Sequence, residues 1–309
     1  MSIVIIRQDD KIEAWKKAIQ DADPNMEVNG YHDAHSKESV TMAIVWKHPK
    51  GSLTPYPNLK CIASSGAGVD FIMADKTISK HIPITRVVDP MLASDMSEHV
   101  LALILAYLKN LNMYRLNQTK TIWQPKRYYR IADLKVGILG LGELGSVLAK
   151  DLAHFGFQVQ GWSQSKKTIA QVTAFSGEGE LTQFLSTTEI LVCLLPLTKQ
   201  TKGILNAELL AQLPKGAHVI NVARGGHVVD TDLLSALDSG QLSGASLDVF
   251  HQEPLATNHA FWKHSKVHMT PHCASVSDTK SVVPQLLDNY KRLSDAKPLL
   301  NIVSRTKGY

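Results

Sequence analysis

Short apolar runs alternate with segments of helical periodicity along most of the 309-residue chain. The apolar runs predict buried strands at residues 2–6, 41–46, 59–63, 84–88, 135–139, 158–162, 189–195, 218–222, 245–250 and 266–269. Between them, apolar residues at helical spacing predict helices that include residues 11–19, 143–154, 206–213, 230–237 and 275–291. Short strands that are apolar throughout and separated by helices are typical of parallel sheets. The pattern therefore predicts an α/β fold whose later part is a doubly wound parallel sheet.

Two adjacent segments depart from this alternation. Residues 97–111 are apolar nearly all round and predict a long, buried helix. Residues 112–131 break that pattern with polar, aromatic and basic side chains, so we interpret them as an excursion before the next strand. Their aromatic and arginine content makes them a candidate contact between subunits, although a packed surface loop is the simpler alternative.

A glycine-rich turn joins the strand at residues 135–139 to the helix that follows it. Gly140 permits a tight turn, Gly142 lets the backbone approach a pyrophosphate, and Gly145 lets the helix pack closely on the strand. The first helical residues, Glu143 and Leu144, offer unpaired N–H groups to phosphates. Strand, glycine turn and helix in this order favour a dinucleotide site over the alternative, a glycine-rich turn with no ligand.

The end of the second strand of this sheet distinguishes the two nicotinamide cofactors. An NAD site usually has Asp or Glu there, which accepts hydrogen bonds from the adenosine ribose. This chain has no acid at residues 161–167 and instead carries Ser163, Gln164, Ser165 and Lys166. Hydroxyls and lysines suit a 2′-phosphate, which an acid would repel. We therefore predict NADPH/NADP as the preferred cofactor; the alternative is a polar surface turn, with NADH/NAD as a possible cofactor.

Composition excludes several classes of function. The apolar content of 44% and charged content of 20% are those of a globular protein, and no apolar run is long enough to span a bilayer. The first residues do not form a signal peptide. Three widely spaced cysteines predict free thiols, no metal site and a cytoplasmic location. The net charge of +5 is mild, and its densest cluster, residues 126–130, is too short to indicate nucleic acid.

Polar residues follow three of the predicted strands: Arg224, Glu253 and His272. Each is weak evidence alone, because a histidine after a strand is usually structural, Arg224 could form an ordinary ion pair, and Glu253 could be a turn residue before proline. An earlier loop of small residues, 64–70, also follows a strand. Its backbone N–H groups could form an anion site or an ordinary tight turn.

Together and in this order, the motifs resemble the D-isomer-specific 2-hydroxyacid dehydrogenase family, over nearly the whole chain. The motifs that carry the resemblance are Gly66-Ala67-Gly68-Val69-Asp70, Ser97-Glu98-His99-Val100, the glycine turn, and residues 195–201, 221–226, 248–254 and 270–275. Within the family, the shorter bacterial glyoxylate/hydroxypyruvate reductases are the most similar. That likeness rests on Trp46, Trp162-Ser163-Gln164-Ser165 and Lys307-Gly308-Tyr309.

The resemblance implies a fold of two α/β domains with a cleft between them. Residues 96–275 would form a Rossmann-type doubly wound parallel sheet that binds the dinucleotide. Residues 1–95 and 276–309 would form a smaller, flavodoxin-like α/β substrate domain. The family also implies a homodimer, with residues 97–131 as a candidate contact, and neither a membrane nor a nucleic-acid partner.

The resemblance further implies roles for the three polar residues in the reduction of a 2-oxo acid. His272 would protonate the alkoxide that develops as hydride reaches the carbonyl carbon. Glu253 would orient the imidazole and favour its protonated form. Arg224 would bind the substrate carboxylate and polarise the carbonyl, a use that suits its planar, permanently charged side chain.

Binding roles follow from the same likeness. The backbone of Ala67 and Gly68 would hold the carboxylate, and Trp46 would cover small substrates, with a core or edge tryptophan as the alternative. Further cofactor contacts would come from Pro196, Thr201 and, beside the nicotinamide carboxamide, Asp248.

Gln164 departs from the pattern, because the similar reductases often have arginine there. Phosphate recognition then falls on Ser163, Ser165 and Lys166, which predicts a weaker cofactor preference. The resemblance thus implies NADPH-dependent reduction of glyoxylate and hydroxypyruvate to glycolate and D-glycerate. One alternative is a reductase of a larger 2-oxo acid. The other is a dinucleotide-sensing, corepressor-like interaction protein, and the presence of Arg224, Glu253 and His272 together argues against that second alternative.

Overall fold

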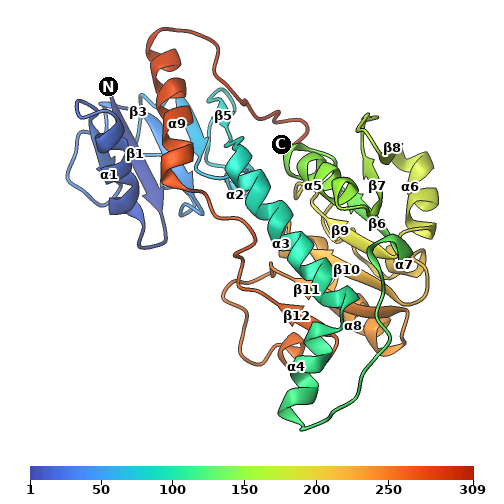
Figure 1. The fold of residues 1–309 in the computed structure, drawn as a ribbon. Coiled ribbons are helices and arrows are strands. Elements are labelled where there is room, and N and C mark those ends of the chain that lie inside the picture. The colour runs from blue at the N-terminus through green and yellow to red at the C-terminus, as the bar shows by residue number, and fades with distance from the viewer. The chain divides into compact units, whose positions relative to one another are not determined.

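The computed structural model describes all residues, 1–309, and the chain forms two compact units. The first unit contains Met1–Leu92 and Val276–Tyr309, and the second contains Ala93–Ser275. The sequence predicted changes of domain after residues 95 and 275. Each unit is built on its own parallel sheet (Figure 1).

The first unit is a five-stranded parallel sheet with strand order β2-β1-β3-β4-β5, the flavodoxin-like order. Its strands are β1 (Ser2–Arg7), β2 (Val28–Gly30), β3 (Val40–Trp46), β4 (Cys61–Ser64) and β5 (Ile84–Thr85). Its helices are α1 (Ile12–Ala22), α2 (Asp70–Ala74) and α9 (Thr279–Ser294).

Successive side chains of each strand point to opposite faces of this sheet, so the strands contribute to two cores. On one face Ile44 packs in a core with Trp15 of α1 and Leu287 of α9, two helices that lie side by side in Figure 1. On the other face Val45 packs in a core with Ile72 of α2. The chain's last residues return to this unit, because Val303 N–H donates to the Ile84 carbonyl at 2.8 Å.

The second unit is a seven-stranded parallel sheet with strand order β12-β11-β10-β9-β6-β7-β8. Its strands are β6 (Lys135–Leu139), β7 (Gln158–Ser163), β8 (Val172–Ser176), β9 (Ile190–Cys193), β10 (Ala217–Asn221), β11 (Leu242–Leu247) and β12 (Val267–Met269). The chain starts at β6, adds β7 and β8 on one side, and then adds β9 to β12 on the other. The predicted doubly wound sheet is therefore confirmed, and its switch point lies between β6 and β9.

Helices cover both faces of this second sheet. The helices are α3 (Pro90–Leu108), α4 (Leu111–Thr119), α5 (Glu143–His154), α6 (Gly177–Ser186), α7 (Ala207–Ala211) and α8 (Asp230–Asp238). The first turn of α3 belongs to the first unit. Three 3₁₀ turns complete the second unit: η1 (Ile131–Asp133), η2 (Gly225–His227) and η3 (Ala260–Lys263). On one face Ile138 and Val192 pack in a core with Ile104 of α3 and Leu148 of α5. The other face packs in a second core with α6, α7 and α8.

Three details of the sequence prediction are wrong. The helix expected at 97–111 begins at Pro90, and the excursion expected at 112–131 begins with helix α4. None of the α4 side chains is buried, so its sequence needs no apolar face that packs on a core. Asn110 separates the two helices with a left-handed backbone, φ 55°. The short edge strands β2 and β8 were also missed, because an edge strand needs no continuous apolar run.

Helix α3 is the one helix long and apolar enough to satisfy the length and hydropathy of a membrane span. Core helices pass the same test, and Val100, Ile104 and Leu108 are fully buried against the second sheet. The opposite face of α3 is half-exposed at Leu101 and Leu105, so the prediction of burial all round is only partly right.

Candidate active site

Arg224 follows β10 in a turn that Asn221 builds. Asn221 is fully buried, and its Nδ2 donates to the Arg224 carbonyl at 2.9 Å while its Oδ1 accepts from Ala223 N–H at 3.2 Å. His227 adds a backbone N–H bond to the same carbonyl at 3.2 Å, and its Nδ1 lies 3.0 Å from it. The backbone of Arg224 is therefore fixed by several bonds, and Nη1 of its half-buried side chain donates to the Ala223 carbonyl at 2.6 Å.

His272 follows β12 with a left-handed backbone, φ 53°, which is uncommon for a residue other than glycine. Its N–H donates to the Asp248 carbonyl at 2.7 Å. Its Nδ1 lies 2.7 Å from Oε2 of Glu253, and the two side chains are only 25% and 20% exposed. Because a carboxylate only accepts, Nδ1 carries the proton, and Nε2 is the ring nitrogen that can exchange a proton with a ligand.

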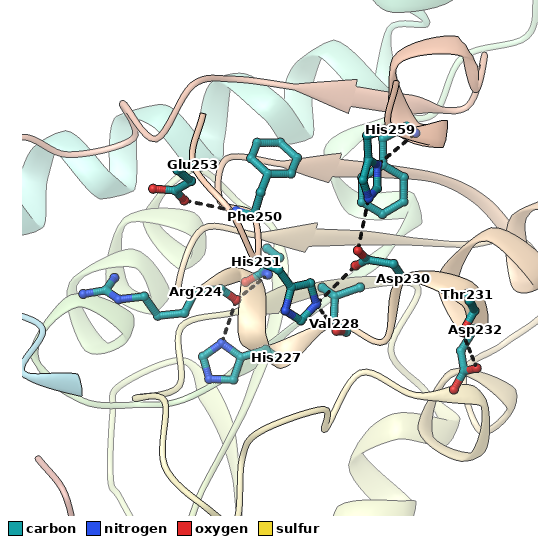
Figure 2. A network of polar contacts seen from close by, with 12 residues as sticks. Arg224, His227, Val228, Asp230, Thr231, Asp232, Phe250, His251, Glu253 and His259 are labelled. Atoms are coloured by element: carbon teal, nitrogen blue, oxygen red, sulfur yellow. Dashed lines mark hydrogen bonds and ion pairs between the residues drawn. The ribbon is translucent and has the colours of Figure 1, made fainter. Parts of the chain in front are cut away.

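Glu253 lies in the turn that follows β11, and its two oxygens have separate partners. Oε2 faces His272, and Oε1 accepts from Phe250 N–H at 3.1 Å, which closes the turn. This turn packs directly on η2, since a Cβ built on Gly225 would overlap the carbonyl carbon of Phe250. The segments that carry Arg224 and Glu253 are thus in contact, and both side chains extend to the same side of the network in Figure 2.

Asp248 braces the segment that carries His272 from both sides. Its buried carboxylate accepts from Thr270 Oγ1 at 2.6 Å, Cys273 N–H at 2.9 Å and Ala274 N–H at 3.0 Å. Burial, together with this carboxylate, raises the pKa of the Cys273 thiol. The position of Asp248 beside a nicotinamide carboxamide stays a prediction, but its part in shaping the His272 loop is direct.

The glycine turn has the geometry that a pyrophosphate needs. Gly140 has φ 107°, and a Cβ there would lie 2.8 Å from the Leu194 carbonyl carbon. A Cβ on Gly145 would overlap the Gly140 carbonyl oxygen, so α5 packs as closely as the sequence predicted. Gly142 precedes α5 with no side-chain cap and with nothing within 4 Å of a built Cβ. The helix N-terminus therefore presents backbone N–H groups beside open space, which fits a phosphate group.

The end of β7 fits a phosphorylated ribose. Ser163 is buried, and its hydroxyl donates to the Ser165 carbonyl at 2.7 Å, which shapes the turn. Gln164, Ser165 and Lys166 are exposed on that turn. The side chains available to a 2′-phosphate are thus an amide, a hydroxyl and an ammonium, with no carboxylate among residues 161–167.

Thr201 closes the predicted cofactor loop after β9. Its hydroxyl donates to the Pro196 carbonyl at 2.6 Å and accepts from Thr198 N–H at 2.8 Å. The Pro196 carbonyl also lies 3.3 Å from Nε2 of His227, in the turn that follows Arg224. Pro196 and Thr201 are therefore joined to each other and to the Arg224 turn, and their contacts with a cofactor stay predicted.

The small-residue loop of the first unit is shaped by its own serine. Ser64 Oγ donates to the Gly68 carbonyl at 2.8 Å and accepts from Gly66 N–H at 3.2 Å, which leaves Ala67 and Gly68 half-exposed. Trp46 lies on this loop, because a Cβ on Gly66 would be 2.8 Å from its Cζ3. Trp46 is therefore packed on the predicted carboxylate loop and half-buried.

Arg7 supports this loop and was missed in the sequence. It is 7% exposed, donates from Nη1 to Ser65 Oγ at 2.7 Å, and binds both oxygens of Asp9 at 2.8 and 2.7 Å. The one signal in the sequence is an arginine that directly follows the apolar run at 2–6, which is ambiguous without the partner strand.

The second unit thus combines a histidine with an oriented Nε2, a permanently charged arginine and a glycine turn that fits a dinucleotide. A histidine can give a proton to an oxyanion, and an arginine can bind a carboxylate. No group of three or more His, Cys, Asp or Glu side chains in residues 1–309 is placed to hold a metal ion. The arrangement suits hydride transfer to a carbonyl with proton donation from the protein.

Comparison with known proteins identifies the same chemistry. A family model described as D-isomer specific 2-hydroxyacid dehydrogenase, NAD binding domain, matches residues 101–274. A glyoxylate/hydroxypyruvate reductase A from Yersinia enterocolitica is 35% identical over 314 aligned positions that include all of both chains. A protein of the same name from Klebsiella pneumoniae is 36% identical, again over all of both chains.

Two solved structures resemble the chain along its length. A D-isomer specific 2-hydroxyacid dehydrogenase from Xanthobacter autotrophicus Py2, in complex with NADPH and MES, has a TM-score of 0.95 and 38% identity, covering 100% of this chain and 99% of the other. An NADPH-dependent glyoxylate/hydroxypyruvate reductase from Sinorhizobium meliloti, in complex with NADP and sulfate, has a TM-score of 0.93 and 36% identity, with 100% of both chains covered.

Proposed function

Because this chain belongs to the D-isomer specific 2-hydroxyacid dehydrogenase family, we propose that it reduces glyoxylate and hydroxypyruvate to glycolate and D-glycerate with NADPH. It is an NAD(P)-dependent oxidoreductase that acts on a small 2-oxo acid. The observation that carries the proposal is the 2.7 Å bond between His272 and Glu253, in the same unit as the glycine turn. The exposed, acid-free turn after β7 and the NADPH or NADP in the related structures support NADPH as the preferred cofactor.

The proposed reaction assigns a proton transfer to His272. When bound, the nicotinamide of NADPH supplies the hydride that the carbonyl carbon receives. His272 donates the Nε2 proton to the carbonyl oxygen as it becomes an alkoxide, and Glu253 retains the Nδ1 proton on the ring. In the reverse direction His272 takes the hydroxyl proton. Arg224 binds the substrate carboxylate and stabilises negative charge on the reacting oxygen.

The proposed cofactor contacts follow the geometry of the second unit. The N–H groups after Gly142 hold the pyrophosphate, and the turn after β7 holds the 2′-phosphate through Ser165 and Lys166. Asp248 fixes the His272 loop, and Pro196 and Thr201 form the loop at the carboxyl end of β9. In the first unit, the N–H groups of Ala67 and Gly68 are the proposed carboxylate donors, with the Trp46 ring limiting the size of the substrate.

The test follows loss of NADPH absorbance with glyoxylate, hydroxypyruvate, pyruvate, phenylpyruvate and oxaloacetate, and is repeated with NADH. We expect the highest kcat/KM for the two smallest polar substrates and for NADPH. A higher kcat/KM for phenylpyruvate would replace the substrate and keep the family. Tight nucleotide binding with no turnover on any 2-oxo acid would refute the reductase and favour a sensing role.

We also propose a homodimer, formed through α3, α4 and the segment that follows them. This region exposes large apolar side chains, namely Leu111 at 55%, Leu116 at 40%, Ile122 at 46% and Trp123 at 100%. Large apolar side chains exposed within one short stretch of chain are typical of subunit contacts. Light scattering after gel filtration should give about twice 34.0 kDa for the wild type and a lower mass for Trp123→Asp. A wild-type mass of one chain would refute the dimer.

A cytoplasmic location completes the proposal. All three cysteines are free, and burial raises the pKa of Cys61 to about 11 and of Cys193 to about 12. Buried, protonated thiols without disulfide partners suit a reducing compartment. Cell fractionation with antibody detection tests this, and recovery in a membrane or secreted fraction would contradict it.

A further inference from the structure

The turn that carries Glu253 has no regular secondary structure of its own. It runs from the end of β11 at Leu247 to η3 at Ala260. Yet Glu253 must be held accurately, because its Oε2 lies 2.7 Å from Nδ1 of His272. Two histidines near the ends of this turn, His251 and His259, bind one carboxylate outside it, that of Asp230 at the start of α8.

Asp230 lies between the two imidazole rings in Figure 2. Its Oδ1 is 3.4 Å from Nε2 of His251, and its Oδ2 is 3.3 Å from Nε2 of His259. The Asp230 side chain is 27% exposed, so its carboxylate is partly shielded from water. One carboxylate therefore joins two residues that are eight positions apart in the chain and that enclose Glu253.

Backbone contacts define the protonated nitrogen of each ring. His251 Nε2 also lies 2.9 Å from the Val228 carbonyl, which only accepts, so Nε2 carries the proton. His259 Nδ1 accepts the Phe261 N–H at 3.3 Å, so in the neutral ring the proton is again on Nε2. Each ring therefore places a protonated Nε2 within 3.4 Å of one oxygen of the Asp230 carboxylate, while the His251 N–H donates to the Val228 carbonyl.

The residues just before Asp230 are buried and bonded within the second unit. Val228 is 3% exposed and pairs with Leu205 in an isolated parallel bridge, and Val229 N–H donates to the Leu205 carbonyl at 3.1 Å. Gly225 packs on the Phe250–His251 peptide from the same side. The turn is thus fixed at its first residues by a backbone contact and at both ends by the Asp230 carboxylate.

We propose that Asp230, through His251 and His259, is a positioning residue that sets the Glu253 carboxylate against His272. The proposal rests on the proposed reductase function. Asp230 touches neither the reacting atoms nor His272, so its effect on the reaction passes through the turn. Loosening the turn should lower the fraction of molecules in which Glu253 holds Nδ1 of His272, and hence lower kcat without weakening NADPH binding.

The test compares steady-state kinetics of Asp230→Asn, His251→Ala, His251→Gln and Asp232→Asn with glyoxylate and NADPH. Asparagine has one acceptor oxygen, so it can satisfy one ring and not both; we expect kcat about 5- to 20-fold lower and KM for NADPH within about twofold. His251→Ala should lose a similar factor. His251→Gln keeps an amide N–H where Nε2 lies and should recover kcat to within about threefold of wild type.

Asp232→Asn is the matched control. Asp232 lies two residues further along α8, and its carboxylate accepts Ala207 N–H at 2.9 Å, away from the turn. We expect wild-type kcat from it. Unchanged kcat in both Asp230→Asn and His251→Ala, beside an active wild type, would overturn the positioning role. Equal losses in Asp230→Asn and Asp232→Asn, or no recovery with His251→Gln, would also overturn it. A wild type inactive on every 2-oxo acid would instead overturn the reductase function itself.

Discussion

Exchanging Glu253 for glutamine tests how the carboxylate acts on His272. In the protein, Oε2 accepts the Nδ1 proton of His272 and Oε1 accepts Phe250 N–H. Glutamine has one acceptor oxygen and one amino group. The oxygen is needed by Phe250 N–H, so the amino group faces Nδ1. Nδ1 must then accept, which leaves the only ring proton on Nε2.

This arrangement removes the ring form that can act as a proton donor. A ring that gives up its Nε2 proton must keep a proton on Nδ1, and the glutamine N–H opposes a proton there. Losing a hydrogen bond to a charged group costs about 1.5–3 kcal/mol, or roughly 10- to 150-fold in rate. The same amide-for-carboxylate exchange in a serine-protease triad lowers kcat by about 10⁴ through the wrong tautomer. We therefore expect kcat/KM to fall by about 10² to 10⁴ in Glu253→Gln.

The assay is NADPH oxidation with glyoxylate, together with NADPH binding by fluorescence. NADPH affinity should stay within about twofold, because the change removes no group that contacts the nucleotide in the proposed site. Glu253→Ala leaves the ring able to adopt either tautomer and should be no slower than Glu253→Gln. A glutamine variant within tenfold of wild type, or clearly faster than the alanine variant, would refute the reasoning.

Three further predictions concern stability and the cofactor. Burial, with a smaller contribution from His268, lowers the pKa of His218 to about 3, so the folded state excludes a proton that the unfolded chain binds below pH 6.5. This group should therefore lower the free energy of unfolding by about 2 kcal/mol between pH 7.5 and pH 5. In denaturant unfolding, His218→Gln should lose about 2 kcal/mol less over the same pH range than the wild type. An equal pH dependence in both proteins would contradict it. Gly145→Ala places a Cβ against the Gly140 carbonyl oxygen and should lower stability by about 1–3 kcal/mol and weaken NADPH binding, measured by thermal unfolding and fluorescence titration. Lys166→Ala should raise KM for NADPH by about tenfold and leave KM for NADH unchanged, whereas equal effects on both cofactors would exclude a phosphate contact.

The central strands and the glycine turn could be predicted because their signals are local. A strand such as β9 is buried on both faces and must be apolar throughout, and Gly140 and Gly145 are each required by a backbone contact that no other residue permits. The edge strand β8 and helix α4 bury little, so their residues are not constrained to a readable pattern.

The supports of the candidate site could not be predicted in the same way. Arg7 meets Ser65, 58 positions away, and Asp230 meets two histidines more than 20 positions away. In each case an ordinary polar residue acquires its part only when the fold brings a partner to it. Arg224, Glu253 and His272 could be proposed from the sequence because each follows a predicted strand in a motif that resembles the family, and parallel strands deliver their ends to one edge of a sheet. Their roles in the reaction stay predictions.

The placement of Arg224, Glu253 and His272 within the single continuous stretch Ala93–Ser275 bears on how such enzymes diversify. The proposed proton donor, its orienting carboxylate and the proposed carboxylate-binding arginine are encoded in one continuous stretch together with the glycine turn. The chain before this stretch carries Trp46 and the Ala67–Gly68 loop, the proposed contacts of the substrate in the first unit. Substitutions in the first unit are thus expected to change the substrate range, while the groups proposed to move the proton stay in place in the second.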